Sequence, residues 1–122
     1  MRVVIMLLAF VLFAPALALA DGVIAINDEE GVSASKVGYG IGHGATDKLA
    51  STAALEACTK NNPDGGCEVK IHYARNKCGA YATSSKIQGT GTGTTREDAI
   101  TAALGQCGTN CQLVVADCDP GQ

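Results

Sequence analysis

The chain has 122 residues, of which 47% are hydrophobic and 4% aromatic, and its formal net charge at pH 7 is −3. Arg2 is the single basic residue before position 21, so the rest of the chain carries eight basic residues against twelve acidic ones. Nucleic acids and anionic membrane surfaces are bound by proteins with a basic surface. The composition therefore argues against a nucleic-acid partner and against attachment to a charged membrane surface.

The first 20 residues have the features of a secretory signal peptide. Arg2 precedes an almost wholly apolar run over residues 3–17, and the small-x-small sequence Ala18-Leu19-Ala20 predicts cleavage before Asp21. A membrane anchor is the weaker interpretation, because a spanning helix needs about 20 apolar residues. We expect an exported protein, secreted or periplasmic, with no membrane insertion after cleavage of the signal peptide.

The remaining residues, 21–122, contain two stretches that resemble each other. Residues 38–73 and 88–117 each combine a Gly-rich strand, a Thr-capped and Ala-rich helix that ends in Cys, a turn, a second Cys and an apolar strand. The GVIAIN sequence of residues 22–27 also resembles the GAYATS sequence of residues 79–84. We therefore predict one domain of two strand–strand–helix–strand repeats, about 21–77 and 78–118, with a short C-terminal tail.

The repeat predicts an α+β fold. Glycine at every second position gives each Gly-rich strand one face without side chains, which fits the close approach of a helix. The helices begin after the N-cap candidates Thr46 and Thr95. Their small residues have the spacing of one helix face: Ala50, Ala53, Ala54 and Ala57 in the first, and Ala99, Ala102 and Ala103 in the second. We expect the repeats to form antiparallel sheet with the two Ala-rich helices packed on it.

Six cysteines lie in the part of the chain that is exported, and an even number there is typical of a disulfide framework. Six cysteines allow 15 pairings, which the repeat narrows. Cys58 with Cys67 and Cys107 with Cys111 occupy equivalent positions, and Cys78 with Cys118 is the pair that remains. Zinc binding is the alternative, but the sequence has no close CxxC pair and no histidine that completes a Cys/His set. We expect no metal.

The sequence lacks a recognisable catalytic set, so we expect no catalytic residues and no enzyme activity. Neither His43 nor His72 has a partner at ligand spacing, and no serine lies in a GxSxG elbow. The Gly-rich strands match neither GxGxxG nor GxxxxGK[ST], so we expect no nucleotide or other cofactor. An envelope-acting hydrolase is the alternative, and it would require a concave pocket that holds one of the histidines beside a carboxylate.

Binding to another protein is the function that these features favour, in the manner of an inhibitor or effector. Two loops, over residues 28–36 and 61–66, are candidates because recognition usually resides on loops of a rigid scaffold. The possible binding surface also includes Tyr39, His43, His72, Tyr73 and Tyr81, although the tyrosines could instead supply bulk to the core. A structural envelope protein without a defined ligand is the third possibility.

The residues also resemble a known family. The segments GYGIGHGATDKLASTAALEAC, CGAYA, GTGTGTTREDAITAALGQC and CQLVVADC are similar to those of the bacterial family called domain of unknown function forty-one eighty-nine. The resemblance implies a small exported protein with two copies of the Gly-strand and Ala-helix unit and paired cysteines. Thr90 and Thr92 depart from the family, whose Gly-rich strands often carry an aromatic residue. The resemblance implies no reaction.

Overall fold

The structure of the protein is a computed structural model that describes residues 21–29, 32–84 and 86–119. The predicted signal peptide lies outside the described residues, as does the end of the predicted tail. Among the residues that the structure describes, no helix has the length and apolar character needed to cross a membrane.

The two halves of the chain have the same order of elements. The first half contains β1 (Asp21–Asn27), the short 3₁₀ helix η1 (Ala34–Lys36), β2 (Gly38–Gly44), α1 (Asp47–Asn61) and β3 (Glu68–Tyr73). The second half contains β4 (Cys78–Thr83), β5 (Gln88–Gly93), α2 (Arg96–Cys107) and β6 (Gln112–Cys118). Each half forms its own antiparallel sheet, in the strand orders β2-β1-β3 and β5-β4-β6. The predicted α+β class is confirmed, and the strands divide between two sheets.

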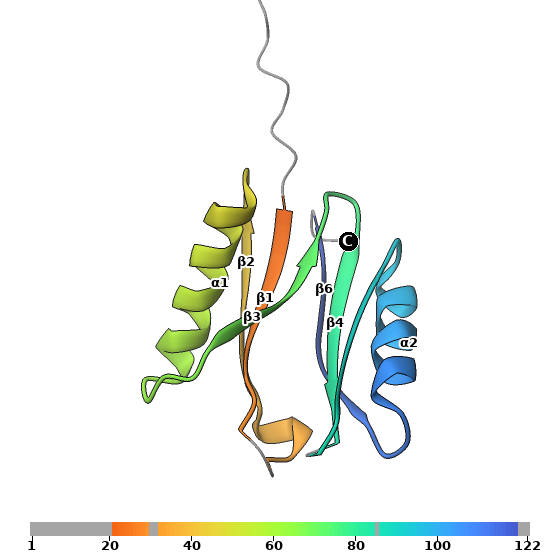
Figure 1. Cartoon of the computed structure of the whole chain (residues 1–122). Coiled ribbons are helices and arrows are strands. Elements are labelled where there is room, and N and C mark those ends of the chain that lie inside the picture. The colour runs from red at the N-terminus through yellow and green to blue at the C-terminus, as the bar shows by residue number, and fades with distance from the viewer. Residues whose placement is uncertain (1–20, 30–31, 85, 120–122) are drawn as a thin grey trace, which may run out of the picture.

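The elements stack in four layers, with the two sheets face to face and one helix on the outer side of each (Figure 1). The larger buried side chains fill the space between the sheets: Ile24, Ile26, Val37, Ile71, Tyr73, Tyr81 and Val115. The layers beneath the helices hold small residues, such as Ala25 with Ala54 and Ala80 with Ala103. Large side chains therefore fill the centre of the molecule, and only small side chains separate each helix from its sheet.

The glycines of β2 and β5 face the helices at very short range. A Cβ atom added to Gly42 would lie 2.2 Å from the carbonyl oxygen of Ala50, and one added to Gly91 would lie 2.3 Å from that of Ala99. These are helix backbone atoms, so no side-chain rotation could make room. The predicted close approach of a helix to a glycine face is present in both halves.

The buried face of each helix is narrower than the alanine pattern predicts. Residues four apart are buried, namely Ala50, Ala54 and Cys58 in α1 and Ala99, Ala103 and Cys107 in α2. Ala53 is half-buried and Ala102 is exposed. A helix that rests directly on a flat strand touches it with the single row of residues at i and i+4, so the neighbouring alanines lie on its flanks. Thr46 and Thr95 cap the helices, accepting from the amides of Leu49 and Asp98.

All six cysteines are joined, in the pairs Cys58–Cys67, Cys78–Cys118 and Cys107–Cys111. Two of these pairs occupy equivalent places, each joining the last turns of a helix to the residue before the next strand. The third joins β4 to β6 and has no counterpart in the first half. Disulfides persist in oxidising compartments, so the three bonds indicate an environment outside the cytoplasm.

Candidate functional site

The structure separates the residues of the predicted binding surface into two groups. Tyr73 is 3% exposed and Tyr81 is fully buried, so the prediction that they belong to a binding surface is wrong. They lie between the sheets and fill the core there with large side chains, whereas the layers under the helices contain small ones. Tyr39, His43 and His72 do reach the surface.

His43 belongs to a polar cluster at one end of the space between the sheets. Its Nε2 atom lies 2.9 Å from Oδ2 of Asp117, and its Nδ1 atom lies 2.8 Å from Oδ1 of Asp119. The Tyr73 hydroxyl donates a hydrogen bond to the same Asp117 oxygen, and its ring meets the His43 ring edge-on at 6.2 Å. We call these four residues the histidine clamp. Because His43 and Tyr73 come from the first half and both aspartates from the second, the clamp ties the halves together.

The contacts within the clamp occupy both ring nitrogens of His43 and the hydroxyl of Tyr73. Both ring nitrogens of His43 already face carboxylate oxygens, so neither can take a proton from a substrate without breaking a contact. The Tyr73 hydroxyl is likewise bound to Asp117. Among the described side chains, no serine, threonine or cysteine makes a hydrogen bond to either histidine. The histidine clamp therefore resembles a structural tie more than an acid–base site.

Asp119 is the most buried member of the clamp, with its side chain 3% exposed. Its amide donates to the carbonyl of Lys77 at 3.0 Å, which fixes the chain just after β6. Its second carboxylate oxygen, Oδ2, is buried and has no hydrogen-bond partner within the described residues. An unpaired buried oxygen is costly, so the contacts of Oδ1 and of the backbone must offset that cost.

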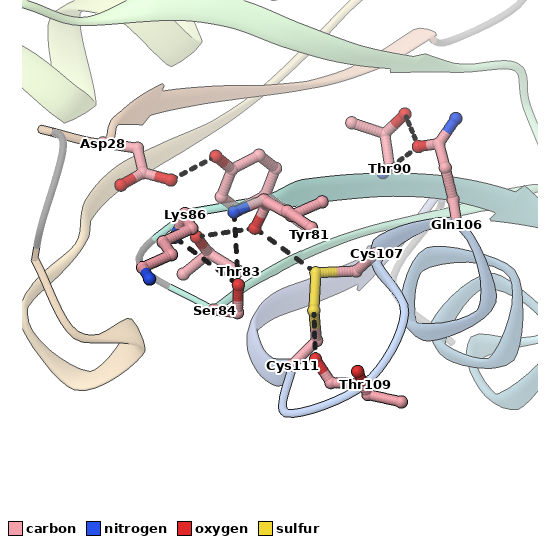
Figure 2. Close-up of a disulfide and its surroundings, with 11 residues drawn as sticks. Asp28, Tyr81, Thr83, Ser84, Lys86, Thr90, Gln106, Cys107, Thr109 and Cys111 are labelled. Atoms are coloured by element: carbon pink, nitrogen blue, oxygen red, sulfur yellow. Dashed lines mark hydrogen bonds between the residues drawn. A yellow bond between two sulfur atoms is a disulfide. The ribbon is translucent and has the colours of Figure 1, made fainter.

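A second tyrosine–carboxylate pair joins the halves at another point. Figure 2 shows the hydroxyl of Tyr81, on β4, directed at Asp28, which follows β1. The two pairs are reciprocal, because Tyr73 reaches from the first half to the second and Tyr81 from the second to the first. The disulfide Cys107–Cys111 lies in the same view, at the end of α2.

Burial raises the pKa of Tyr73 and of Tyr81 far above the ordinary value, and the bonded carboxylates, Asp117 and Asp28, raise it further. An unfolded chain releases these protons near pH 10, whereas the folded protein keeps them. Their contribution to stability is therefore complete below about pH 10 and is lost as the pH rises above it. In an alkaline titration followed by tyrosinate absorbance, we expect these two tyrosines to ionise only as the protein unfolds.

The Tyr81→Phe variant is the control for that titration, since it should remove one tyrosine from the late, unfolding-linked step. Ionisation of Tyr73 and Tyr81 near pH 10 in a protein that keeps its circular dichroism would contradict the burial of both hydroxyls.

His72 lies on the other face of β3 and has a different setting. Its Nδ1 atom lies 2.7 Å from Oδ1 of Asp47 at the start of α1, and both side chains are about half exposed or more, at 49% and 67%. A hollow of about 330 Å³ lies beside it, lined by His72, Tyr73, Ala74, Lys77, Thr92, Gly93 and Thr94. Asp47, the partner of His72, is not among the residues that line this hollow.

The two predicted binding loops come together at one end of the first half. A hollow of about 260 Å³ lies between them, lined by Asn27, Glu29, Val32, Lys36, Asn61, Asn62, Pro63 and Asp64. A larger hollow of about 590 Å³ runs along α1 and is lined by Thr52, Leu55, Glu56, Thr59, Lys60 and Pro63. Pro63 lines both. We call the two together the loop–helix surface.

Hydrogen bonds and a disulfide hold the second of these loops in place. Asn27 donates to the carbonyl oxygen of Gly65 at 3.0 Å, and Asn62 donates to that of Cys58 at 2.9 Å. The Cys58–Cys67 disulfide closes the base of the same loop. The loop is therefore held in one conformation by its own contacts.

No group of three or more His, Cys, Asp or Glu side chains is arranged to hold a metal ion within the described residues. The histidine clamp brings three such side chains together, but the two ring nitrogens of His43 point in opposite directions toward Asp117 and Asp119. The three side chains therefore cannot converge on one ion.

Comparison with known proteins gives one match. Neither the curated proteins nor the solved structures contain a match to this chain. Residues 22–118 match the family described as Domain of unknown function (DUF4189), and this range spans both halves of the fold and all six cysteines. The resemblance seen in the sequence is thereby confirmed, and the chain belongs to this family of proteins whose function is undefined.

Proposed function

We propose that the protein is an exported, non-enzymatic module that binds another protein through the loop–helix surface of its first half. One observation carries the proposal: the two connections that are longer in the first half than in the second meet around a single hollow. The link between β1 and β2 spans residues 28–37, against 84–87 in the second half. The link between α1 and β3 spans residues 62–67, against 108–111.

Asp28 and Val37 anchor the longer first connection to the rest of the fold. Glu29 and Lys36, which lie between them, line the hollow instead, and this favours a role in recognition. The second half forms the same sheet and helix with shorter connections, so the longer ones are not needed to close the fold. Their hollow adjoins the hollow along α1, where Leu55 and Pro63 offer apolar contacts between Glu56 and Lys60. An apolar centre with charges at its rim is typical of protein-binding surfaces.

The setting of His43 also favours binding over catalysis. The ring nitrogens of His43 are both bound to carboxylates inside the histidine clamp. A nucleophile or general base must have a free position that faces the substrate, and the ring nitrogens of His43 have none.

An envelope-acting hydrolase is the second candidate, and the hollow beside His72 is the observation that favours it. The His72–Asp47 pair resembles a base held by a carboxylate, and Thr92 and Thr94 line the same hollow. The exposure of both partners weakens their interaction, since solvent screens such a pair. Hydrolysis of purified cell-wall material or of peptides that is lost in His72→Ala and kept in Lys60→Ala would establish this alternative.

Photo-crosslinking at two equivalent positions tests the binding proposal. Thr52 lines the hollow along α1, and Thr101 is its equivalent on α2; both are exposed threonines. A photoreactive benzophenone residue at position 52 should give one defined protein adduct in the organism that produces the protein, and the same residue at position 101 should give none. Equal adducts at both positions would place binding elsewhere. Absence of adducts at both positions would favour a structural protein without a ligand.

A further inference from the structure

The inner strand of each sheet is flanked by two edge strands, and β2 and β5 are equivalent edges. Ile24 of β1 is paired with Ile41 of β2, and Tyr81 of β4 is paired with Thr90 of β5 in the same register. A strand at a sheet edge presents a row of backbone amides and carbonyls that no neighbouring strand satisfies. Both edges would therefore be open to an added strand unless something covers them.

The edge of β5 is covered by a side chain from the helix above it. Oε1 of Gln106, on α2, accepts from the Thr90 amide at 2.6 Å and from the Thr90 hydroxyl at 3.2 Å. Figure 2 shows Gln106 directed at Thr90 from the helix. The Thr90 amide therefore points away from β4, and its hydrogen bond to Gln106 closes the middle of this edge.

No side chain of the described residues makes an equivalent hydrogen bond to the edge of β2. The residue of α1 equivalent to Gln106 is Ala57, whose methyl group can accept no hydrogen bond. By the shared register, the Ile41 amide points away from β1 just as that of Thr90 points away from β4. Lysine, proline and bulges protect other edge strands. The β2 sequence GYGIGHG contains neither lysine nor proline, and its pairing with β1 has no bulge. The amides of Tyr39, Ile41 and His43 thus form an open edge.

We propose that the β2 edge binds an extended segment of a partner protein, which pairs with it as a fourth strand of the first sheet. This mode of recognition draws affinity from main-chain hydrogen bonds. It uses a different surface from the loop–helix surface, so either proposal can fail alone.

The position of α1 identifies the occupant as an extended segment and excludes a second copy of this chain. Cβ atoms added to Gly40 and Gly42 would lie 2.2 Å from backbone atoms of α1, so the helix lies directly over β2. Two paired β2 strands would be about 4.8 Å apart, whereas packed helices need about 8–10 Å between their axes. The two α1 helices would collide, but a strand that carries no helix of its own would fit.

The surroundings of the edge specify the chemistry of the bound segment. On the side of α1 the segment would pass beneath the flank that carries Ala53 and Ala57, so its side chains there must be small. On the other side it would lie beside Tyr39, which is 41% exposed, and Ile41, which packs against the core between the sheets. Alternation of small residues with apolar or aromatic ones should therefore mark the partner.

A library of seven-residue peptides, the length of β2, tests this proposal with one pair of variants. Ala57→Gln gives α1 the side chain that covers the edge of β5 in the second half. Ala57→Met adds a side chain of about the same length that lacks the amide oxygen. Peptides selected on the wild-type protein should bind Ala57→Gln about tenfold more weakly or worse, since one hydrogen bond of the edge is then satisfied internally. They should bind Ala57→Met nearly as well as the wild type. Gln106→Ala should open β5 and allow peptides to perturb the Thr90 amide resonance.

Three outcomes would overturn the proposal. The library could yield no peptide that binds, or the selected peptides could bind Ala57→Gln as tightly as the wild type. The protein could instead associate with itself in sedimentation equilibrium and lose that association in Ala57→Gln, which would make a second copy the occupant. None of these outcomes bears on the crosslinks at position 52, so failure here is distinct from failure of the loop–helix surface.

Discussion

Replacing Gly91 with alanine should lower the free energy of unfolding by about 3 kcal/mol or more, at the upper end of the cost of overpacking a core. The added Cβ would lie 2.3 Å from the carbonyl oxygen of Ala99 and 2.4 Å from the amide nitrogen of Ala103. Both are helix backbone atoms, so α2 must move away from β5 as a unit. Denaturation with urea, followed by circular dichroism, measures the change.

Gly105→Ala is the matched control. Gly105 lies within α2, is exposed and has no other atom near its missing Cβ. Because alanine is the better helix former, this substitution should stabilise the protein by up to about 1 kcal/mol. The Cβ of Ala102 is the nearest side-chain atom to the added methyl group, at 2.8 Å. If Gly91→Ala were as harmless as Gly105→Ala, or if Ala102→Gly restored its stability, the helix backbone would not rest on the glycine face.

Removing the disulfide between Cys78 and Cys118 should have the second large effect. Its cysteines are 40 residues apart, so replacing both with alanine frees a long loop in the unfolded chain and should cost about 4 kcal/mol. The bond also holds the end of β6 against β4, beside the two aspartates of the histidine clamp. Denaturation under non-reducing conditions compares the variant with the wild type.

The Cys107–Cys111 pair provides the comparison for that experiment. Its cysteines are four residues apart, and the same loop-entropy argument gives a cost of about 2 kcal/mol for replacing both with alanine. Equal losses in the two double variants would show that loop length does not set the stabilisation.

The local features of the fold could be read from the sequence because they depend on neighbouring residues. Alternating glycines mark β2 and β5, the threonine caps mark the starts of α1 and α2, and equivalent cysteines mark two of the disulfides. The division into two sheets could not be read in this way. Nothing local distinguishes strands that continue a sheet from strands that begin a new one facing it.

The partners of the tyrosines and histidines were missed for the same reason. His43 and Asp119 are 76 residues apart, and Tyr81 and Asp28 are 53 apart, so no spacing pattern connects them. One signal was available. Tyr73 and Asp117 occupy equivalent positions at the ends of the last strands of the two halves, and equivalent residues meet where two such halves face each other.

In β3, Val69, Ile71 and Tyr73 alternate with Glu68, Lys70 and His72, a pattern typical of a strand with one solvent-exposed face. Such a strand belongs to a sheet whose other face is buried, whether by a helix or by a second sheet. Here the second sheet covers that face. Tyr73 could therefore be assigned to a buried face, but the sequence pattern did not show that its hydroxyl meets a carboxylate of the other half.

In both proposals the two halves share one architecture but differ in what they leave open, because the first half is free to bind and the second is closed. Residue-resolved amide hydrogen exchange in the free protein tests this at the equivalent residues Ile41 and Thr90. We predict that the Ile41 amide exchanges several times faster than the Thr90 amide, which Gln106 protects. Equal protection of the two amides, or slower exchange at Ile41, would contradict the claim.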